Sequence, residues 1–180
     1  IECLRNRGIE PIHHSYQTHA RQMNFAIAQA TNDWVLCLDS DEYLSAECVS
    51  AINKLKPALA DITVAYRIER HWRVLGRDVR AMYPVSSPDR QVRLFHRQQV
   101  RFNDQPVDDK AVGFKTKANL SGRVTHDTFF SVGEVLSKLN SYTGRLVQYK
   151  EIPPSLLRAV LSPPFAFFKW YFRKGAYRDG

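Results

Sequence analysis

The sequence predicts an α/β fold, a sheet flanked by helices, and three observations predict it. Residues 34–38 form a short and uniformly apolar run, which is typical of a strand buried on both faces. Residues 18–30 before this run and 45–57 after it carry apolar side chains three to four positions apart, as helices that lie on a sheet do. Residues 62–68 alternate between apolar and polar side chains, which indicates a strand with one covered face.

Composition limits the class of protein. A chain of 180 residues suits one domain with a real core. The three cysteines, Cys3, Cys37 and Cys48, have no metal or redox spacing, and an odd number argues against a disulfide framework, so we expect a reducing compartment. The net charge of +8 favours a polyanionic partner, which is a nucleic acid, an anionic membrane surface or a phosphate-bearing substrate. No apolar run is long enough to predict a membrane span.

The first residues predict the end of a helix, a turn at Gly8 and a short strand over residues 9–12. The chain begins without an initiator methionine or the apolar core of a signal peptide, and this abrupt start suggests a fragment. His13 and His14 are adjacent and diverge from each other, so a solvated loop is a better interpretation of this pair than a metal site.

An acidic cluster, Asp39, Asp41 and Glu42, follows the apolar run directly. Ligands of open α/β sheets bind beyond the carboxyl ends of strands. If the chain stays extended there, Asp39 and Asp41 project to one side and can hold Mg²⁺ or Mn²⁺, which neutralises a diphosphate. The alternative is a strand-to-helix turn whose acids favour the N-terminus of the next helix. These three residues alone leave both interpretations open.

The second half of the chain predicts five further segments in order. They are a long basic surface loop over 71–90, a strand over 92–96 that pairs with 100–102, a polar loop over 103–110, a last strand over 120–125 ending at His126 and Asp127, and a helix opened by a capping box at Ser131 and Glu134. The apolar face of that helix is expected to carry Leu136, Leu139, Tyr142 and Leu146.

The tail after Pro153 differs in composition, and we therefore divide the chain into residues 1–152 and an amphipathic tail over residues 153–180. The tail mixes aromatic and aliphatic side chains with cations, and Pro163 and Pro164 are expected to divide it into two short helical pieces. Rings and cations together suit the interface of an anionic membrane. A helix that completes the core, or a dimer contact, is the alternative.

Six stretches of the chain carry a resemblance to a known family. They are residues 20–27, 33–42, 92–95, 101–110, 122–143 and 171–180. In this order they resemble glycosyltransferase family 2, and in particular the bacterial enzymes that add sugars to the lipopolysaccharide core or to related envelope glycans. The likeness covers nearly the whole chain, and the ordered series is more specific than any one stretch.

The resemblance implies a GT-A (Rossmann-like) fold with a mixed sheet, a nucleotide-sugar donor, and Mg²⁺ or Mn²⁺ at the Asp-x-Asp motif. By this analogy Asp39 lies near the donor ribose, Asp41 ligates the metal, and Gln22 and Asn24 lie on the donor side. The first strand of such a fold and the polar segment that grips the nucleotide base are absent, so we expect the first half of the nucleotide-binding unit to be missing.

For the chemistry, the resemblance implies an inverting transfer that needs a base for the acceptor hydroxyl. Relatives often show Val-His-Glu where this chain has Val-Asp-Asp, which makes Asp109 the candidate base and Asp108 the alternative. The remaining candidate contacts are cationic side chains: Arg90, Arg93 and Arg101 for phosphate, and His126 for the diphosphate or the metal.

The predicted function is therefore transfer of a sugar from a nucleotide-sugar donor to a lipopolysaccharide-core or related glycan or glycolipid acceptor. The expected location is cytoplasmic, at the inner face of the bacterial inner membrane, with an anionic membrane surface and no nucleic acid as partner. The alternatives are a sugar nucleotidyltransferase, a non-catalytic relative, and a basic nucleic-acid-binding module, although no zinc-finger or RNA-recognition signature is present.

Overall fold

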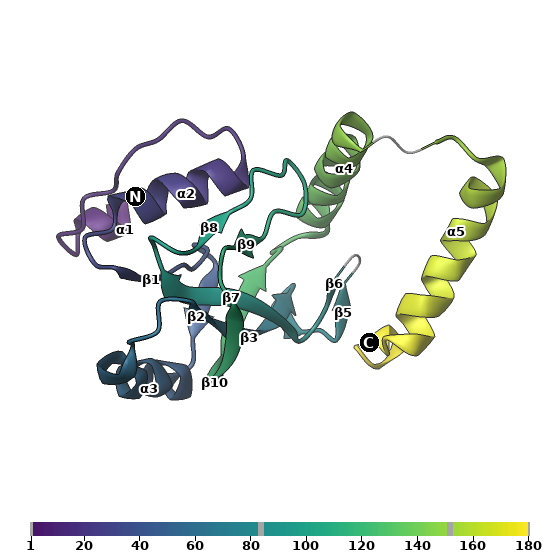
Figure 1. Ribbon diagram of the computed structural model, residues 1–180. Coiled ribbons are helices and arrows are strands. Elements are labelled where there is room, and N and C mark those ends of the chain that lie inside the picture. The colour runs from purple at the N-terminus through teal and green to yellow at the C-terminus, as the bar shows by residue number, and fades with distance from the viewer. Residues whose placement is uncertain (1, 83–84, 151–152, 180) are drawn as a thin grey trace.

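The computed structural model describes residues 2–82, 85–150 and 153–179, and it confirms an α/β protein with a mixed sheet (Figure 1). The main sheet has the strand order β1-β7-β3-β10-β2, and β4 pairs with β3 outside this path. β3 and β10 are parallel, whereas the other pairs of this sheet are antiparallel. Two small antiparallel pairs, β5–β6 and β8–β9, complete the described strands.

The α-helices are α1 (Glu2–Arg5), α2 (His19–Gln29), α3 (Ala46–Leu55), α4 (Val132–Tyr149) and α5 (Leu156–Phe168), and short helical turns are η1 (Lys56–Ala58), η2 (Lys169–Arg173) and η3 (Ala176–Arg178). The strands are β1 (Trp34–Leu36), β2 (Glu42–Leu44), β3 (Val64–Val74), β4 (Arg77–Asp78), β5 (Ala81–Met82), β6 (Val85–Ser86), β7 (Asp89–His96), β8 (Arg101–Phe102), β9 (Ala111–Val112) and β10 (Thr116–Thr128).

Two helices pack on the main sheet, as the sequence predicts, and they lie on opposite sides of it (Figure 1). α2 begins at Thr18, whose hydroxyl accepts the N–H of Arg21, and it buries Ile27 in a cluster with Phe95. α3 begins at Ser45, and its buried Cys48 packs against β3 and β10. Each helix therefore closes its own apolar cluster on the sheet.

Three predicted details at this end of the fold are wrong. β1 lies at the end of the sheet with one strand neighbour, so Leu36 stays 36% exposed and the strand is not buried on both faces. Residues 9–12 form no strand, because they pair with no other strand. The predicted apolar face over residues 45–57 includes Val49, which is exposed, because the face of α3 toward the sheet is that of Cys48 and Ile52.

The predicted surface loop over residues 71–90 is also wrong. β3 continues to Val74, and the short strands β4, β5 and β6 and the start of β7 follow it, joined by turns and bends. Side chains pack in a row along the extension of β3. The guanidinium of Arg70 lies 4.8 Å from the ring centre of Trp72, and His126 packs edge-to-face against that ring at 4.4 Å. Residues 101–102 pair with β9 rather than with β7.

Both neighbours of β3 change register at Arg67. β7 slips by one residue between Leu94 and Val92, which leaves Arg93 out of the ladder, and β10 slips between Asn119 and Arg123. Such bulges re-aim side chains and bend a strand. Within the β10 bulge Gly122 has φ +84°, and a Cβ there would lie 2.3 Å from the backbone nitrogen of Cys48. Only glycine allows β10 to approach the start of α3 so closely.

α4 begins at the predicted cap, where Ser131 accepts the N–H of Glu134. The Glu134 carboxylate reaches back to the N–H of Phe130, one residue before the partner that a capping box requires. Leu139, Tyr142 and Leu146 are partly covered as predicted, whereas Leu136 is exposed.

α5 runs unbroken through Pro163 and Pro164, which corrects the predicted division into two pieces. Each proline removes one N–H donor, but α5 is exposed, so water can bond the carbonyl groups that lose their partner. α5 stands apart from the sheet (Figure 1). The chain after α5 returns to the residue before β5, where Asp179 accepts the N–H of Arg80 at 2.8 Å. The boundary between residues 152 and 153 stays a prediction.

Candidate active site

Residues 39–42 form a tight turn at the end of β1 that separates the predicted acidic pair. The N–H of Glu42 donates to the carbonyl of Asp39 at 3.1 Å, which closes a turn over the two residues between them. Asp39 and Asp41 therefore do not project to one side, as they would in an extended chain. Asp39 lines one cavity and Asp41 lines another.

The Asp39 cavity has a volume of about 480 Å³ and is strongly basic. Its charged lining residues are His19, Asp39, Arg67, Arg70, Arg90, Arg93, Asp108, Asp109, Lys110 and Lys117. They come from α2, from the strands β3, β7 and β10, from the turn that follows β1, and from the loop before β9, so the fold gathers them from most of the chain. Cations in such number favour a ligand that carries negative charge.

A buried carboxylate stands behind this cavity. The side chain of Glu42 is fully buried between two arginines: Arg70 at 3.3 Å and Arg93, with which it forms a short ion pair. Glu42 also accepts the backbone N–H of Asp39 at 3.1 Å. Arg70 is held in addition by Asp89 at 2.7 Å. The turn is therefore fixed to β3 and β7 by ion pairs rather than by apolar packing.

His19 joins two acids that are far apart in the sequence. Its Nδ1 lies 2.8 Å from Asp109, and its Nε2 lies 3.6 Å from Asp39. The hydrogen bond to Asp109, followed by that to Asp39, raises the pKa of His19 to about 9, so the imidazole is protonated at neutral pH. His19 in turn, together with Arg93, holds the pKa of Asp39 below its usual range.

The carboxylates of the two candidate bases, Asp109 and Asp108, have different contacts. Asp109 faces the cavity and contacts His19, and its side chain is 15% exposed. Asp108 has φ +62° and turns its carboxylate to α4 and the residue after it, where it contacts the hydroxyl of Tyr142 at 3.3 Å and the ammonium of Lys150 at 2.8 Å. Lys150 lowers the pKa of Asp108. The geometry therefore favours Asp109 over Asp108.

Asp41 contacts a histidine across the pairing of β2 with β10. Its carboxylate lies 3.0 Å from Nε2 of His126, and its backbone carbonyl accepts the N–H of Asp127 at 2.9 Å. The ring of His126 packs against Trp72, and its Nδ1 is buried without a hydrogen-bond partner. The sequence predicts that His126 contacts the diphosphate or the metal, and the structure places His126 beside Asp41.

These side chains fit a hard divalent cation only with help from a ligand. Asp41 offers carboxylate oxygens and His126 an imidazole nitrogen, but the described residues contain no group of three metal-ligating side chains. Mg²⁺ commonly takes one or two carboxylates and completes its shell with water and substrate phosphates. Asp39 adds nothing in this geometry, since its oxygens face His19 and Arg93.

Three other predicted site residues are held in structural contacts. Asn24 exchanges two hydrogen bonds with the backbone of Phe102, at 2.8 and 2.9 Å, and so fixes α2 to β8. Gln22 contacts His14 at 3.0 Å. Arg93 lines the Asp39 cavity, but its guanidinium is paired with carboxylates. Their predicted contacts with the donor stay predictions.

Sequence reasoning assigned no role to His19, Arg70 or Glu42. His19 was part of a helix pattern, and no spacing linked it to Asp109. Arg70 was one of many cations in a basic strand. Of these three residues, Glu42 alone could have been noticed in the sequence. A third acid so close to an apolar strand is unusual, and its carboxylate needs either solvent or a charged partner.

Comparison with known proteins identifies a family and a curated relative. The family described as Glycosyl transferase family 2 matches residues 1–115. A lipopolysaccharide core biosynthesis glycosyltransferase, LpsC, from Rhizobium meliloti (strain 1021) is 28% identical over 182 aligned residues. That alignment covers 94% of this chain and 65% of the relative, so the chain spans about two thirds of the length of this relative.

Removing the buried carboxylate of Glu42 should lower the free energy of unfolding more than removing an exposed carboxylate. In Glu42→Ala the side chains of Arg70 and Arg93 lose a partner in a nearly solvent-free place, and we expect a loss of about 3–5 kcal/mol in the free energy of unfolding. Denaturant unfolding measures this loss, with exposed Glu47→Ala as the control. Equal stability of the two variants would show that the arginines find other partners.

The protonated His19 should make stability depend on pH. Its folded pKa of about 9 lies above the unfolded value near 6.5, so its stabilising contribution is complete below about 6.5 and is lost as pH rises through about 9. The free energy of unfolding of the wild type should therefore exceed that of His19→Gln most at the acidic end, and the two should converge above about pH 9. The exposed His13→Gln is the control, and parallel curves for wild type and His19→Gln would refute the pairing.

Proposed function

The chain belongs to glycosyl transferase family 2, and we propose that it transfers a sugar from a nucleotide-sugar donor to a hydroxyl group of a glycan acceptor. One observation carries this proposal: Asp39 and Asp109 meet at His19 in a cavity lined with cations. The GT-A type of fold, with a mixed sheet flanked by helices, agrees with it. The similarity to a lipopolysaccharide core glycosyltransferase supports a core or related envelope glycan as acceptor.

The proposed step is an inverting displacement. Asp109 takes the proton of the acceptor hydroxyl, whose oxygen attacks the anomeric carbon of the donor sugar. The bond from that carbon to the diphosphate breaks, and the nucleoside diphosphate leaves with the bonding electrons. His19 positions the Asp109 carboxylate through the 2.8 Å contact, and the cavity keeps this carboxylate largely away from water. A base must lie within about 3 Å of the hydroxyl that it deprotonates.

The departing diphosphate needs positive charge nearby. Arg90 and Lys117 line the Asp39 cavity and supply part of it. Asp41 and His126 would hold Mg²⁺ or Mn²⁺, which when bound neutralises negative charge on the diphosphate. The division of labour that we propose is therefore Asp109 for the acceptor proton, Asp39 for the donor side and Asp41 with His126 for the cation.

We also propose that the tail places the protein on the inner face of the inner membrane. From Leu156 to Phe172 nine large apolar side chains are 41–82% exposed, and the described part of the tail contains five cations and one carboxylate. Exposed rings next to cations suit an anionic lipid interface. No helix in the described part of the chain is long and apolar enough to cross a membrane. A peripheral position agrees with that finding.

The base assignment is tested by two neighbouring substitutions in the full-length protein. Asp109→Asn should reduce kcat by roughly 10²–10⁴-fold while donor binding is retained, because it removes the proton acceptor but leaves Asp39 and the cations of the cavity in place. Asp108→Asn is the matched control and should have a milder effect, since Asp108 faces Tyr142 and Lys150. If the two effects are reversed, Asp108 is the base, and if both are slight, this loop carries no base.

The tail is tested by binding to vesicles that contain anionic lipid. Phe168→Ser with Phe172→Ser should weaken binding by at least about tenfold, because each removes apolar area that would enter the interface. Lys169→Gln with Arg173→Gln should weaken binding most at low salt. Val49→Ser, at an exposed apolar residue of α3, is the control. Unchanged binding by the tail variants would assign the tail to a dimer contact.

A further inference from the structure

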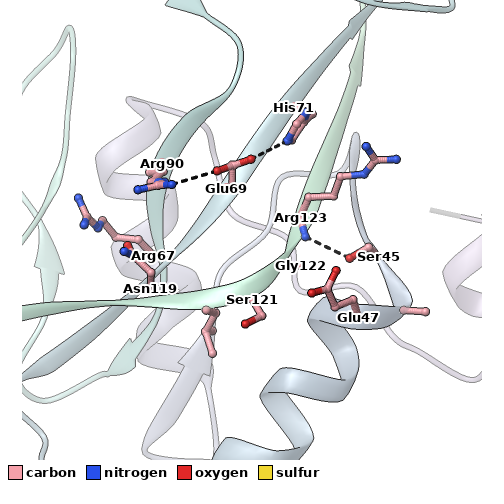
Figure 2. A pocket seen from close by; sticks show the side chains of 12 residues that line it. Ser45, Glu47, Arg67, Glu69, His71, Arg90, Asn119, Ser121, Gly122 and Arg123 are labelled. Carbon is pink, nitrogen blue, oxygen red and sulfur yellow. Dashed lines mark hydrogen bonds and ion pairs between the residues drawn. The ribbon is translucent and has the colours of Figure 1, made fainter.

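A third cavity, of about 760 Å³, lies where the start of α3 meets β3, β7 and β10 (Figure 2). We refer to it as the arginine cavity, because Arg67, Arg90 and Arg123 line it together with Glu69, Asn119 and Ser121. Its volume is within the range of cavities that hold small molecules. The β10 bulge forms one wall of it. From Asn119 to Arg123 β10 advances by four residues, while the paired β3 advances by two, from Arg67 to Glu69, and Gly122 lets the bulge lie against the start of α3.

The charges of this cavity are not balanced by its own carboxylates. Glu69 is shared between Arg90, at 3.2 Å, and His71, at 2.9 Å (Figure 2). Within the described residues neither Arg67 nor Arg123 makes an ion pair, and Glu47, at the start of α3, is the other acid that lines the cavity. The cavity thus keeps two guanidinium groups available for an anion.

Arg67 adds an independent reason to expect a ligand. Its Nε is buried and has no hydrogen-bond partner. A buried donor without a partner is unfavourable, and an oxygen anion that enters the cavity could supply the missing acceptor. The planar fork of arginine also matches the two oxygens of a phosphate or a carboxylate. Asn119 and Ser121, whose side chains make no internal hydrogen bond in the described structure, can bind hydroxyl groups beside the anion.

The arginine cavity adjoins the Asp39 cavity. Arg67 and Arg90 line both, so one molecule can reach from the candidate base Asp109 past these two side chains to Arg123. A glycan acceptor whose hydroxyl lies at Asp109 would place its neighbouring sugar residue in this direction. The shared wall therefore connects the arginine cavity to the acceptor rather than to the cation site at Asp41, which lines a separate cavity.

We propose that the arginine cavity binds an anionic group, a phosphate or a carboxylate, on a sugar residue of the acceptor next to the one that reacts. This inference rests on the proposed function, because it assumes that Asp109 receives the acceptor hydroxyl. It names the substrate class more narrowly: the acceptor is a charged glycan, and Arg123 and Arg67 select it over an uncharged one.

The first experiment measures binding and needs no turnover, so its result does not depend on whether the proposed function is correct. Binding of inorganic phosphate to the full-length protein is measured by calorimetry for the wild type, Arg123→Gln and Arg77→Gln. Arg123 lines the arginine cavity but not the Asp39 cavity, whereas Arg77 is an exposed residue of β4, so the two variants change the net charge equally. We expect Arg123→Gln to lose at least tenfold in affinity and Arg77→Gln to match the wild type. Equal affinities in all three proteins would overturn the proposal.

The second experiment separates a group on the acceptor from a free anion. Initial rates are compared for a phosphorylated oligosaccharide acceptor and its dephosphorylated counterpart. Arg123→Gln should raise the KM of the phosphorylated acceptor at least tenfold, with little change in kcat. For the dephosphorylated acceptor, the KM values of Arg123→Gln and Arg77→Gln should be equal. If Arg123→Gln loses phosphate affinity but keeps the KM of the phosphorylated acceptor, the cavity binds a free anion and the assignment to the acceptor is overturned.

Discussion

The buried carboxylate of Glu42 is the contact on which the rest of the site depends. An ionised carboxylate without solvent needs charged partners, and Arg70 and Arg93 supply them from two different strands. Because Glu42 also accepts the N–H of Asp39, the same ion pairs fix the turn that follows β1. An apolar side chain at this position could neither hold two guanidinium groups nor orient Asp39.

The turn and the two bulges distribute the polar groups among three cavities. The turn directs Asp39 toward His19 and Asp41 toward His126, while the β7 bulge frees Arg93 from the ladder so that it meets Glu42. A regular strand would alternate its side chains and place every second one on the same face. The irregular places of the sheet are therefore the places where this protein gathers its charges, as bulges beside active sites commonly do.

The regular elements of this fold could be predicted from the sequence, because α2, α3 and β3 show the periodicity of their secondary structure and Thr18, Ser45 and Ser131 act as caps. The candidates Asp41 and His126, and Asp109 with Asp39, were also named in advance and lie in or beside cavities. What could not be predicted was which of them meet. The role of His19 depends on tertiary contacts, and the acidic residues alone did not decide between an extended chain and a turn after the apolar run. The continuous α5 was missed because propensity treats Pro163 and Pro164 as a break.

The central claim is that Asp41, set apart by this turn, serves the cation and the departing diphosphate. The most direct measurement is donor turnover by the full-length protein in Mg²⁺ and in Mn²⁺, compared between Asp41→Asn and Asp78→Asn, an exposed acid of β4. We predict that Asp41→Asn loses metal-dependent turnover, a loss of several kcal/mol in transition-state stabilisation, while its unfolding curve matches that of Asp78→Asn. Near-normal turnover by Asp41→Asn in both metals would contradict the claim.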